Sequence, residues 1–256
     1  MKFVISPAKS LDFDAPSNSK HYTSPHFISD AARIIEALKK KSVKKLMDLQ
    51  GISLALAELN YERNQNWLQK HDLSNSKQAI SAFSGDVYVG INESDFDESD
   101  YEYIQDHLRI LSGLYGLLRP LDIIHPYRLE MGTSLSTTRG KNLYDFWKLR
   151  ITNKMNEELA TSPDSVLINL ASDEYFKVIK PKVLQARIIQ PIFYDKSKGQ
   201  YKVISFFAKK ARGMMVRFAT KNKISNEEDL KEFKSEGYSF EPNMSEGNKW
   251  VFTRES

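Results

Sequence analysis

Residues 108–132, LRILSGLYGLLRPLDIIHPYRLEMG, are the stretch around which the rest of the chain is built. Through its first half and just before it, apolar side chains recur at alternating steps of four and three, at Ile104, Leu108, Leu111, Tyr115 and Leu118. This spacing predicts a core-facing helix. Gly113 and Gly116 each cost about 1 kcal/mol relative to alanine inside a helix, so they mark a break, a tight turn, or a close approach to another backbone or a phosphate. Pro120 then ends the helix.

The second half of this stretch, residues 122–131, is predicted to be extended. Successive side chains of a strand point to opposite faces, so Arg128 and Glu130 share one face. The opposite face is apolar and carries Tyr127, Leu129 and Met131. Arg119 lies in the turn that joins the two halves. The stretch therefore joins a buried helix, a glycine-containing turn and a strand that presents one arginine and one glutamate.

The amino-acid composition limits the classes of protein to which this chain can belong. A chain of 256 residues with 41% hydrophobic content can bury a sizeable core, and we expect one domain over residues 1–256. No run of 18 apolar residues is present, which argues against a membrane protein. Cysteine is absent, which excludes disulfides and thiolate metal sites and suits a cytoplasmic location. The five histidines form no HxH or HExxH pair, so neither a metal nor a cofactor is expected.

The net charge indicates less about function than the composition does. With 37 basic and 33 acidic residues the net charge is +4, which is mild for a protein that binds nucleic acid. Any anion site must therefore come from local clustering of cations.

The N-terminus predicts a strand over residues 2–6, followed by a loop that Pro7 keeps from continuing the strand. In this loop Lys9, with Ser6 and Ser10, would suit an anion contact like that of a phosphate-binding loop, although the glycine-rich cradle is missing. An ordinary solvated loop is the alternative.

Periodicity and caps place the other elements. Helices are expected after Ser29 or Asp30, from Ser42 to Gly51, and over residues 53–67 and 142–159. Strands are expected over residues 165–170, 187–194 and 201–207, with Pro191 placing the second at an edge or a bulge. The fold class is thus mixed α/β (α+β), a central sheet with surrounding helices. The acidic residues at 95, 97 and 100 are interpreted as helix caps, because they lack the glycine and terminal glutamate of a calcium loop.

The sequence AKKARGMMVRFATKN, at 208–222, is interpreted as the most basic patch. Lys209, Lys210, Arg212 and Arg217 are expected at or just beyond a strand-to-helix junction, where backbone N–H groups favour anions. Gly213 would permit close approach. The alternative is a solvated helix face over an apolar core.

Several segments together resemble the YaaA family of bacterial peroxide-stress proteins, and the resemblance covers nearly the whole chain. They are ISPAKSLDF, FSGDVYVG, HLRILSGLYGLLRPLDIIHPYRLEMG, LYDFWKLRITNKMNE, INLASDEYFK, ISFFAKKARGMMVRF and SEGYSF. The resemblance implies a cytoplasmic protein that limits damage during peroxide stress, is associated with low free iron, and has a fold outside the common superfolds. It also implies DNA binding through a basic cleft and a helix-hairpin-helix-like element. We place that element on the helix ending near Ser112, the Gly113–Gly116 turn and residues 117–119.

Three functions remain open at this point. The first is binding of DNA, duplex, distorted or single-stranded, with little sequence specificity; the contacts to DNA or phosphate would come from Lys9, Gly113, Gly116, Arg119, Arg128, Lys177, Lys209, Lys210 and Arg212. The second is an enzyme acting on a nucleotide or other phosphorylated small molecule in the same cleft; its catalytic candidates are Lys9, Glu130, Asp173 and Tyr175. The third, direct iron sequestration, has the least support because cysteine is absent and no ExxH pattern presents carboxylates.

Overall fold

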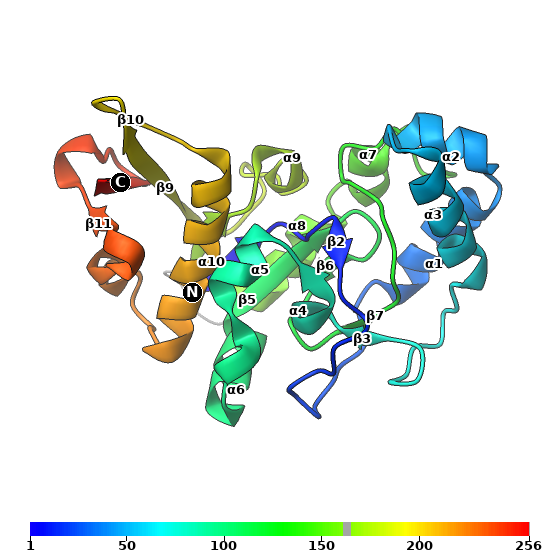
Figure 1. The fold of residues 1–256 in the computed structure, drawn as a ribbon, viewed down its shortest axis with the longest axis horizontal. Coiled ribbons are helices and arrows are strands. Elements are labelled where there is room, and N and C mark those ends of the chain that lie inside the picture. The colour runs from blue at the N-terminus through cyan, green and yellow to red at the C-terminus, as the bar shows by residue number, and fades with distance from the viewer. Residues whose placement is uncertain (161–164, 256) are drawn as a thin grey trace.

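The computed structural model describes residues 1–160 and 165–255, and it confirms a mixed α/β fold with helices around a central sheet (Figure 1). The order of the strands in this sheet is β11-β12-β9-β8-β1-β5-β6, and β10 pairs with β9. Their bounds are β1 Lys2–Ile5, β5 Leu108–Ser112, β6 Gly116–Leu118, β8 Val166–Leu170, β9 Arg187–Ser197, β10 Gln200–Lys202, β11 Ser239–Phe240 and β12 Lys249–Glu255.

Five of these strands run parallel, in the pairs β1 with β5, β1 with β8, β8 with β9 and β9 with β12. Counted in chain order, they lie as 2-1-3-4-5 across the sheet. This order occurs in doubly wound sheets, which bind ligands at the carboxyl ends of the strands where the order reverses. In this chain the reversal lies between β1 and β8. A long excursion between β1 and its neighbour β5 sets the arrangement apart from the usual doubly wound fold.

The helices and two small sheets cover this core. The α-helices are α1 Ile28–Lys39, α2 Val43–Gln50, α3 Leu54–Asn66, α4 Ala79–Ala82, α5 Asp86–Ile91, α6 Glu98–His107, α7 Leu143–Trp147, α8 Arg150–Leu159, α9 Asp173–Phe176 and α10 Ser205–Lys221. Short 3-10 helices are Glu93–Asp95, Glu227–Glu232, Ser235–Gly237 and Pro242–Met244. The small sheets pair β2 Ser10–Leu11 with β4 Phe83–Ser84, and β3 Lys77–Gln78 with β7 Ile123–Ile124. In Figure 1 α1, α2 and α3 gather at one end of the molecule, and β9, β11 and α10 lie at the other.

Local signals predicted several elements correctly. The Ser42 hydroxyl accepts the N–H of Lys45 at the start of α2, and Gly51 ends that helix in the left-handed conformation. Ser53 caps α3 in the same way. The first helix, however, begins at Ile28 after Phe27, so its N-cap lies two or three residues ahead of the caps predicted for it.

The stretch at 108–118 is a correction, because it forms a β-hairpin and not a helix. Helix α6 ends at His107, and β5 and β6 pair antiparallel with Ser112 opposite Gly116. Every residue from 108 to 118 is buried, so the segment has no polar face that would distinguish a helical period from a strand. The helix-hairpin-helix-like element placed here is therefore wrong for these residues. Gly116 has a φ of +72°, which suits glycine in the tight turn.

Two other elements are shorter than predicted. The helix expected over residues 142–159 is broken at Lys148, whose φ is +47°. Trp147 donates to the carbonyl of Gly113 at 3.0 Å, and the chain turns after it so that Ile151 can also face the core. The strand expected over residues 201–207 stops at 202, and α10 begins at Ser205, before its first buried residue Ala208.

Pro191 shows how a proline can lie inside a sheet. Strand β9 as a whole has neighbours on both sides and is not an edge strand, but Pro191 itself is paired only with β12. The N–H of Gln190 donates to Asn248 on the β12 side at 2.8 Å, so the nitrogen of Pro191 faces the β8 side. Pairing with β8 has already ended at Ile189. The missing donor of proline therefore breaks no hydrogen bond of the ladder.

Candidate functional site at the carboxyl ends of the parallel strands

The site lies where the strand order reverses, just beyond the ends of β1 and β8. Ser6 follows β1, and its hydroxyl accepts the N–H of Ser172, which follows β8, at 2.9 Å. The two hydroxyls are 3.2 Å apart. Tyr88 on α5 donates to the carbonyl of Ser6 at 3.2 Å. These contacts hold three distant segments together at the point where such sheets bind ligands.

A set of ion-paired side chains lies beyond these strand ends. Lys9 Nζ is 3.1 Å from one oxygen of Glu130, and Arg128 Nη2 is 2.9 Å from the other. Residues 125–131 alternate between buried and partly exposed side chains, as predicted, which turns both charged groups outward. Of the strand predicted over residues 122–131, however, only Ile123–Ile124 forms a strand. Lys9 is 65% exposed. The Nε of Arg128 is buried without a hydrogen-bond partner, which leaves one donor for a ligand or a water.

Helix α9 adds acidic and aromatic groups to the site. Tyr175 is buried, lies beside Tyr127 and Arg128 in a small cavity, and burial raises its pKa, with Tyr127 adding to the shift. Glu174 accepts the N–H of Gly132 at 2.8 Å. Lys177 Nζ lies 5.1 Å from the ring centre of Tyr144, whose hydroxyl donates to the backbone of residue 174.

Helix α10 contributes further charged groups to the site. Burial lowers the pKa of the Arg212 guanidinium, and the charge of Asp173 opposes this shift, so the two groups act on each other. Lys209 is 55% exposed and lies 3.9 Å from Asp86. Gly85, next to Asp86, packs beside Ala8, and this links α10 back to the loop of Lys9. Lys9, Arg128, Glu130 and Tyr175 thus line one small cavity. The groups on the bordering segments are Asp173 and Lys177 at α9, and Lys209 and Arg212 on α10. We call these groups together the cleft.

Other predicted site residues lie elsewhere. Gly113 is buried beneath the segment that carries Glu130: a Cβ there would lie 2.4 Å from the carbonyl oxygen of Leu129. A Cβ at Gly116 would lie 2.7 Å from the Trp147 ring. Both glycines therefore serve core packing.

Two predicted cations are also outside the cleft or already paired. Strand β6 runs back toward the amino edge of the sheet, so Arg119 lies at the edge opposite the cleft and pairs with Asp122 at 2.9 Å. Lys210 is ion-paired with Glu236.

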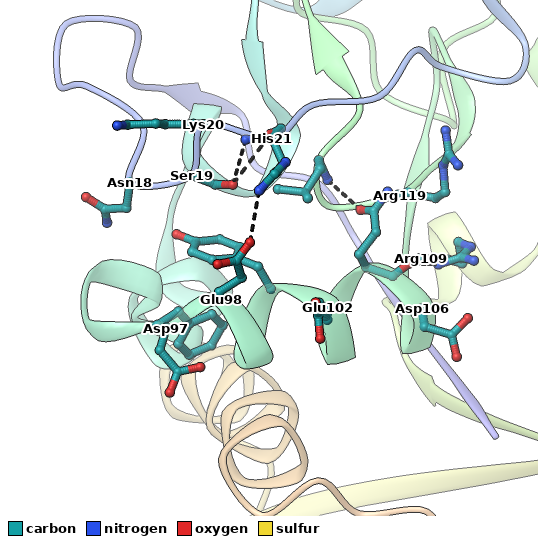
Figure 2. A pocket seen from close by; sticks show the side chains of 14 residues that line it. Asn18, Ser19, Lys20, His21, Asp97, Glu98, Glu102, Asp106, Arg109 and Arg119 are labelled. Atoms are coloured by element: carbon teal, nitrogen blue, oxygen red, sulfur yellow. Dashed lines mark hydrogen bonds and ion pairs between the residues drawn. The ribbon is translucent and has the colours of Figure 1, made fainter.

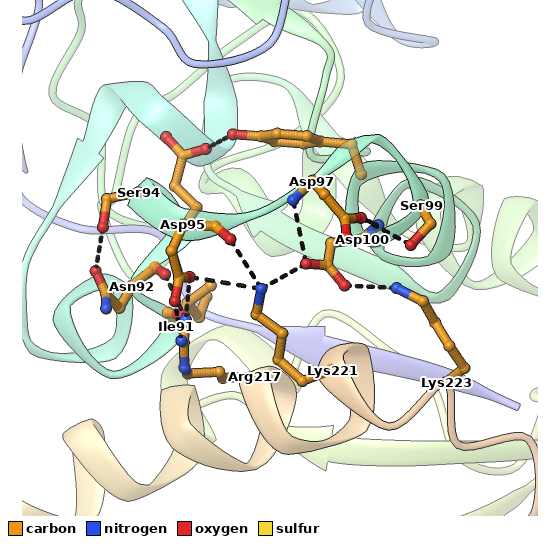
Figure 3. A network of polar contacts seen from close by, with 12 residues as sticks. Ile91, Asn92, Ser94, Asp95, Asp97, Ser99, Asp100, Arg217, Lys221 and Lys223 are labelled. Carbon is orange, nitrogen blue, oxygen red and sulfur yellow. Dashed lines mark hydrogen bonds and ion pairs between the residues drawn. The ribbon is translucent and has the colours of Figure 1, made fainter.

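The end of α10 belongs to a separate network (Figure 3). Hydrogen bonds from Arg217 lower the pKa of Asp95 to about 2. Lys221 and Lys223 donate to the buried carboxylate of Asp100 at 2.6 and 2.5 Å. Asp97 and Asp100 form a capping box at the start of α6, which confirms the predicted capping role. Arg217 therefore joins α10 to the loop before α6 and is not part of the cleft.

A cavity of about 690 Å³ lies along α6 at the opposite edge of the sheet (Figure 2). Several of its polar side chains already have partners: His21 pairs with Glu98 at 3.0 Å, and Gln105 accepts the N–H of Leu121 at 2.9 Å. Arg109 pairs with Glu158. We favour the cleft as the functional site, because the strand order reverses there and several of its groups remain available to a ligand.

Sequence reasoning missed Tyr88 and Asp86, and it did not pair Ser6 with Ser172. The two serines did carry a signal, since each lies within two residues of the end of a buried parallel strand. Tyr88 and Asp86 carried none, because their place depends on how α5 packs against α10.

Comparison with known proteins shows the family of the chain. Residues 1–244 match the family model described as peroxide stress protein YaaA. The chain belongs to this family. It is 48% identical over 256 residues to a UPF0246 protein of Burkholderia mallei, covering 99% of the chain and 98% of that protein. It is also 48% identical over 255 residues to a UPF0246 protein of Cellvibrio japonicus, covering 100% and 99%.

Membership of the YaaA family supports a role in peroxide stress. Among the residues that the structure describes, no helix has both the length and the apolar character needed to cross a bilayer.

Proposed function

We propose that this YaaA-family protein acts in the cytoplasm during peroxide stress by binding DNA phosphates along the cleft. The proposal is supported by Lys9 and Arg128 in one small cavity beyond the end of β1, and by three further cations, Lys177, Lys209 and Arg212, on segments that border it. Lys9 and Lys209 are more than half exposed, so they can reach a backbone phosphate without loss of buried structure. Such contacts are made to phosphates and not to bases, so they carry little sequence specificity.

Limiting iron-dependent oxidative damage is part of the proposal as an effect of DNA binding. The exposed groups of the cleft are mainly cations, and these repel iron ions. A bound protein would shield the DNA that it covers.

A specific observation supports an alternative in the same cleft. Glu130, Asp173 and Tyr175 lie among the cations, which is more acid and base chemistry than phosphate binding requires. The unpartnered Nε of Arg128 suits a fixed oxygen acceptor. An enzyme acting on a nucleotide or other phosphorylated small molecule is therefore the second candidate.

The test is a fluorescence-anisotropy titration with duplex, bubbled and single-stranded DNA over a salt series. We expect a Kd of roughly 1–100 µM at physiological salt and a steep salt slope. Lys9→Ala/Lys209→Ala should reduce the duplex slope by about two units, since each lost phosphate contact removes about 0.9.

The matched control removes two exposed lysines at the far end of the sheet, Lys234→Ala/Lys249→Ala. Its slope should stay that of the wild type. Equal slopes for both double variants, or no binding to any of the three DNA forms, would move the assignment to the small-molecule enzyme.

A further inference from the structure

A second concave surface lies along α1, outside the cleft. A cavity of about 500 Å³ separates the exposed face of this helix from the loop at 136–138. The lining residues from α1 and the two residues after it follow one another at steps of three, one, three and one, which places them on one side of the helix: Arg33, Glu36, Ala37, Lys40 and Lys41. We call this cavity the α1 pocket.

The charge of the α1 pocket is positive and uncommitted. Three cations and one carboxylate line it, for a net charge of +2. Within residues 1–160 and 165–255, no carboxylate forms an ion pair with Arg33, Lys40 or Lys41. In the cleft, by contrast, Lys9 is paired with Glu130. The α1 pocket thus holds cations that are more available to an outside anion.

The helix ends do not cancel this positive charge. Lys40 is the C-cap of α1, where the helix dipole is negative and would repel an anion. Ser42 is the N-cap of α2, so the positive end of the next helix lies two residues away. Opposite ends of similar strength offset each other at this junction. The side chains therefore set the local field.

The loop opposite adds hydroxyl donors in fixed positions. Ser136, Thr137 and Thr138 all line the pocket. The Thr137 hydroxyl accepts the N–H of Arg139 at 3.1 Å, so its own hydrogen remains to be donated. Arg139 is anchored by its ion pair with Asp30, and this holds the loop beside α1 before any ligand arrives.

We propose that the α1 pocket binds a compact polyanion with two or more phosphate groups, such as inorganic pyrophosphate or the phosphates of a nucleotide. Its volume lies within the range of roughly 300–1,000 Å³ typical of small-ligand sites, and a concave pocket suits a small anion better than a duplex. None of the described residues that line it is aromatic, so it recognises phosphate and not a base. Arg33 and Lys40 are seven residues apart on one face, about 10 Å along the helix, which lets both reach one extended phosphate chain.

The test is isothermal titration calorimetry of the full chain with inorganic pyrophosphate, compared with orthophosphate and a nucleoside triphosphate. Lys40→Ala/Lys41→Ala should weaken pyrophosphate binding by at least about tenfold, because two charge-assisted contacts are lost. Thr138→Val should weaken it by a smaller factor. Equal affinity for pyrophosphate and the triphosphate would identify phosphate as the recognised group.

The matched control is Lys44→Ala/Lys45→Ala, which removes the same charge from exposed positions of α2 that do not line the pocket. It should change the affinity by no more than about twofold. An equal loss in both double variants, or no heat with millimolar pyrophosphate, would overturn the proposal.

The result for the α1 pocket can be distinguished from the result of the DNA-binding test of the cleft. Lys9→Ala/Lys209→Ala should leave pyrophosphate binding at the α1 pocket intact, and Lys40→Ala/Lys41→Ala should leave the DNA salt slope intact. Loss of pyrophosphate binding in the cleft variant alone would assign the ligand to the cleft and overturn the α1 pocket.

Discussion

Tyr115 is a fully buried phenol whose hydrogen bonds determine the protonation of a neighbouring histidine. Its oxygen accepts from Trp67 Nε1 at 3.0 Å and from the N–H of His125 at 3.1 Å, which uses both lone pairs. The phenol hydrogen must then go to Nε2 of His71, 3.0 Å away. We infer that His71 is neutral with its hydrogen on Nδ1. Burial, followed by the charge of His125, lowers the pKa of His71 to about 4.

This pKa predicts a loss of stability in mild acid. The folded pKa lies below the ordinary value of about 6.5, so the stabilisation is full above pH 6.5 and is lost as the pH falls from about 6.5 toward 4. One histidine contributes at most about 1.4 kcal/mol per pH unit, and solvent access to this partly exposed ring reduces that to about 0.5–1. Urea unfolding from pH 7 to 4.5 should show a flatter dependence in His71→Gln than in the wild type. The exposed His26→Gln is the control, and equal slopes in all three proteins would contradict the inference.

At the scale of elements, the crossing of α5 and α10 depends on two glycines. A Cβ at Gly213 would lie 1.8 Å from the carbonyl oxygen of Val87, and one at Gly90 would lie 2.2 Å from that of Lys210. The predicted close approach at Gly213 is therefore confirmed, but it is an approach to another helix. This crossing also places Tyr88 and Lys209 beside the cleft.

The sign of the stability change caused by one substitution tests this crossing. Helix propensity alone predicts that Gly213→Ala stabilises the protein by about 1 kcal/mol. Because backbone atoms cannot yield as a side chain can, we expect the opposite, a loss of at least about 2 kcal/mol in urea unfolding. Gly51→Ala is the control: its φ is +60° with nothing within 4 Å, so it should cost about 1 kcal/mol from backbone strain alone. A stabilised Gly213→Ala variant would show that the helices can move apart.

At the scale of the whole molecule, buried apolar residues from Phe3 to Phe252 form one continuous core. We therefore propose that the chain is a single domain and unfolds in one transition. Trp250→Phe leaves Trp67 and Trp147 as fluorescent reporters of the part of the molecule near α3 and α7. In this variant, midpoints in urea from tryptophan fluorescence and from far-ultraviolet circular dichroism should coincide. Separate midpoints would indicate two units.

The sequence by itself determined the features that rest on neighbours along the chain. The caps at Ser42 and Ser53, the buried strand after residue 165 and the outward face of Arg128 and Glu130 all follow from signals within a few residues. The family resemblance added the expectation of a basic cleft. In this cleft Lys9 and Arg128 both contact Glu130, and the sequence had already indicated all three as candidate site residues.

Only the tertiary structure decided the rest. The hairpin at 108–118 was out of reach because a fully buried segment looks apolar in every register. The reversal of strand order between β1 and β8 depends on pairing across more than 160 residues, and no local pattern encodes it. The cleft exists because that reversal places two strand ends and α10 side by side, and the α1 pocket exists because the loop at 136–138 lies against α1. Local chemistry sets which groups are charged, and long-range packing sets which of them meet.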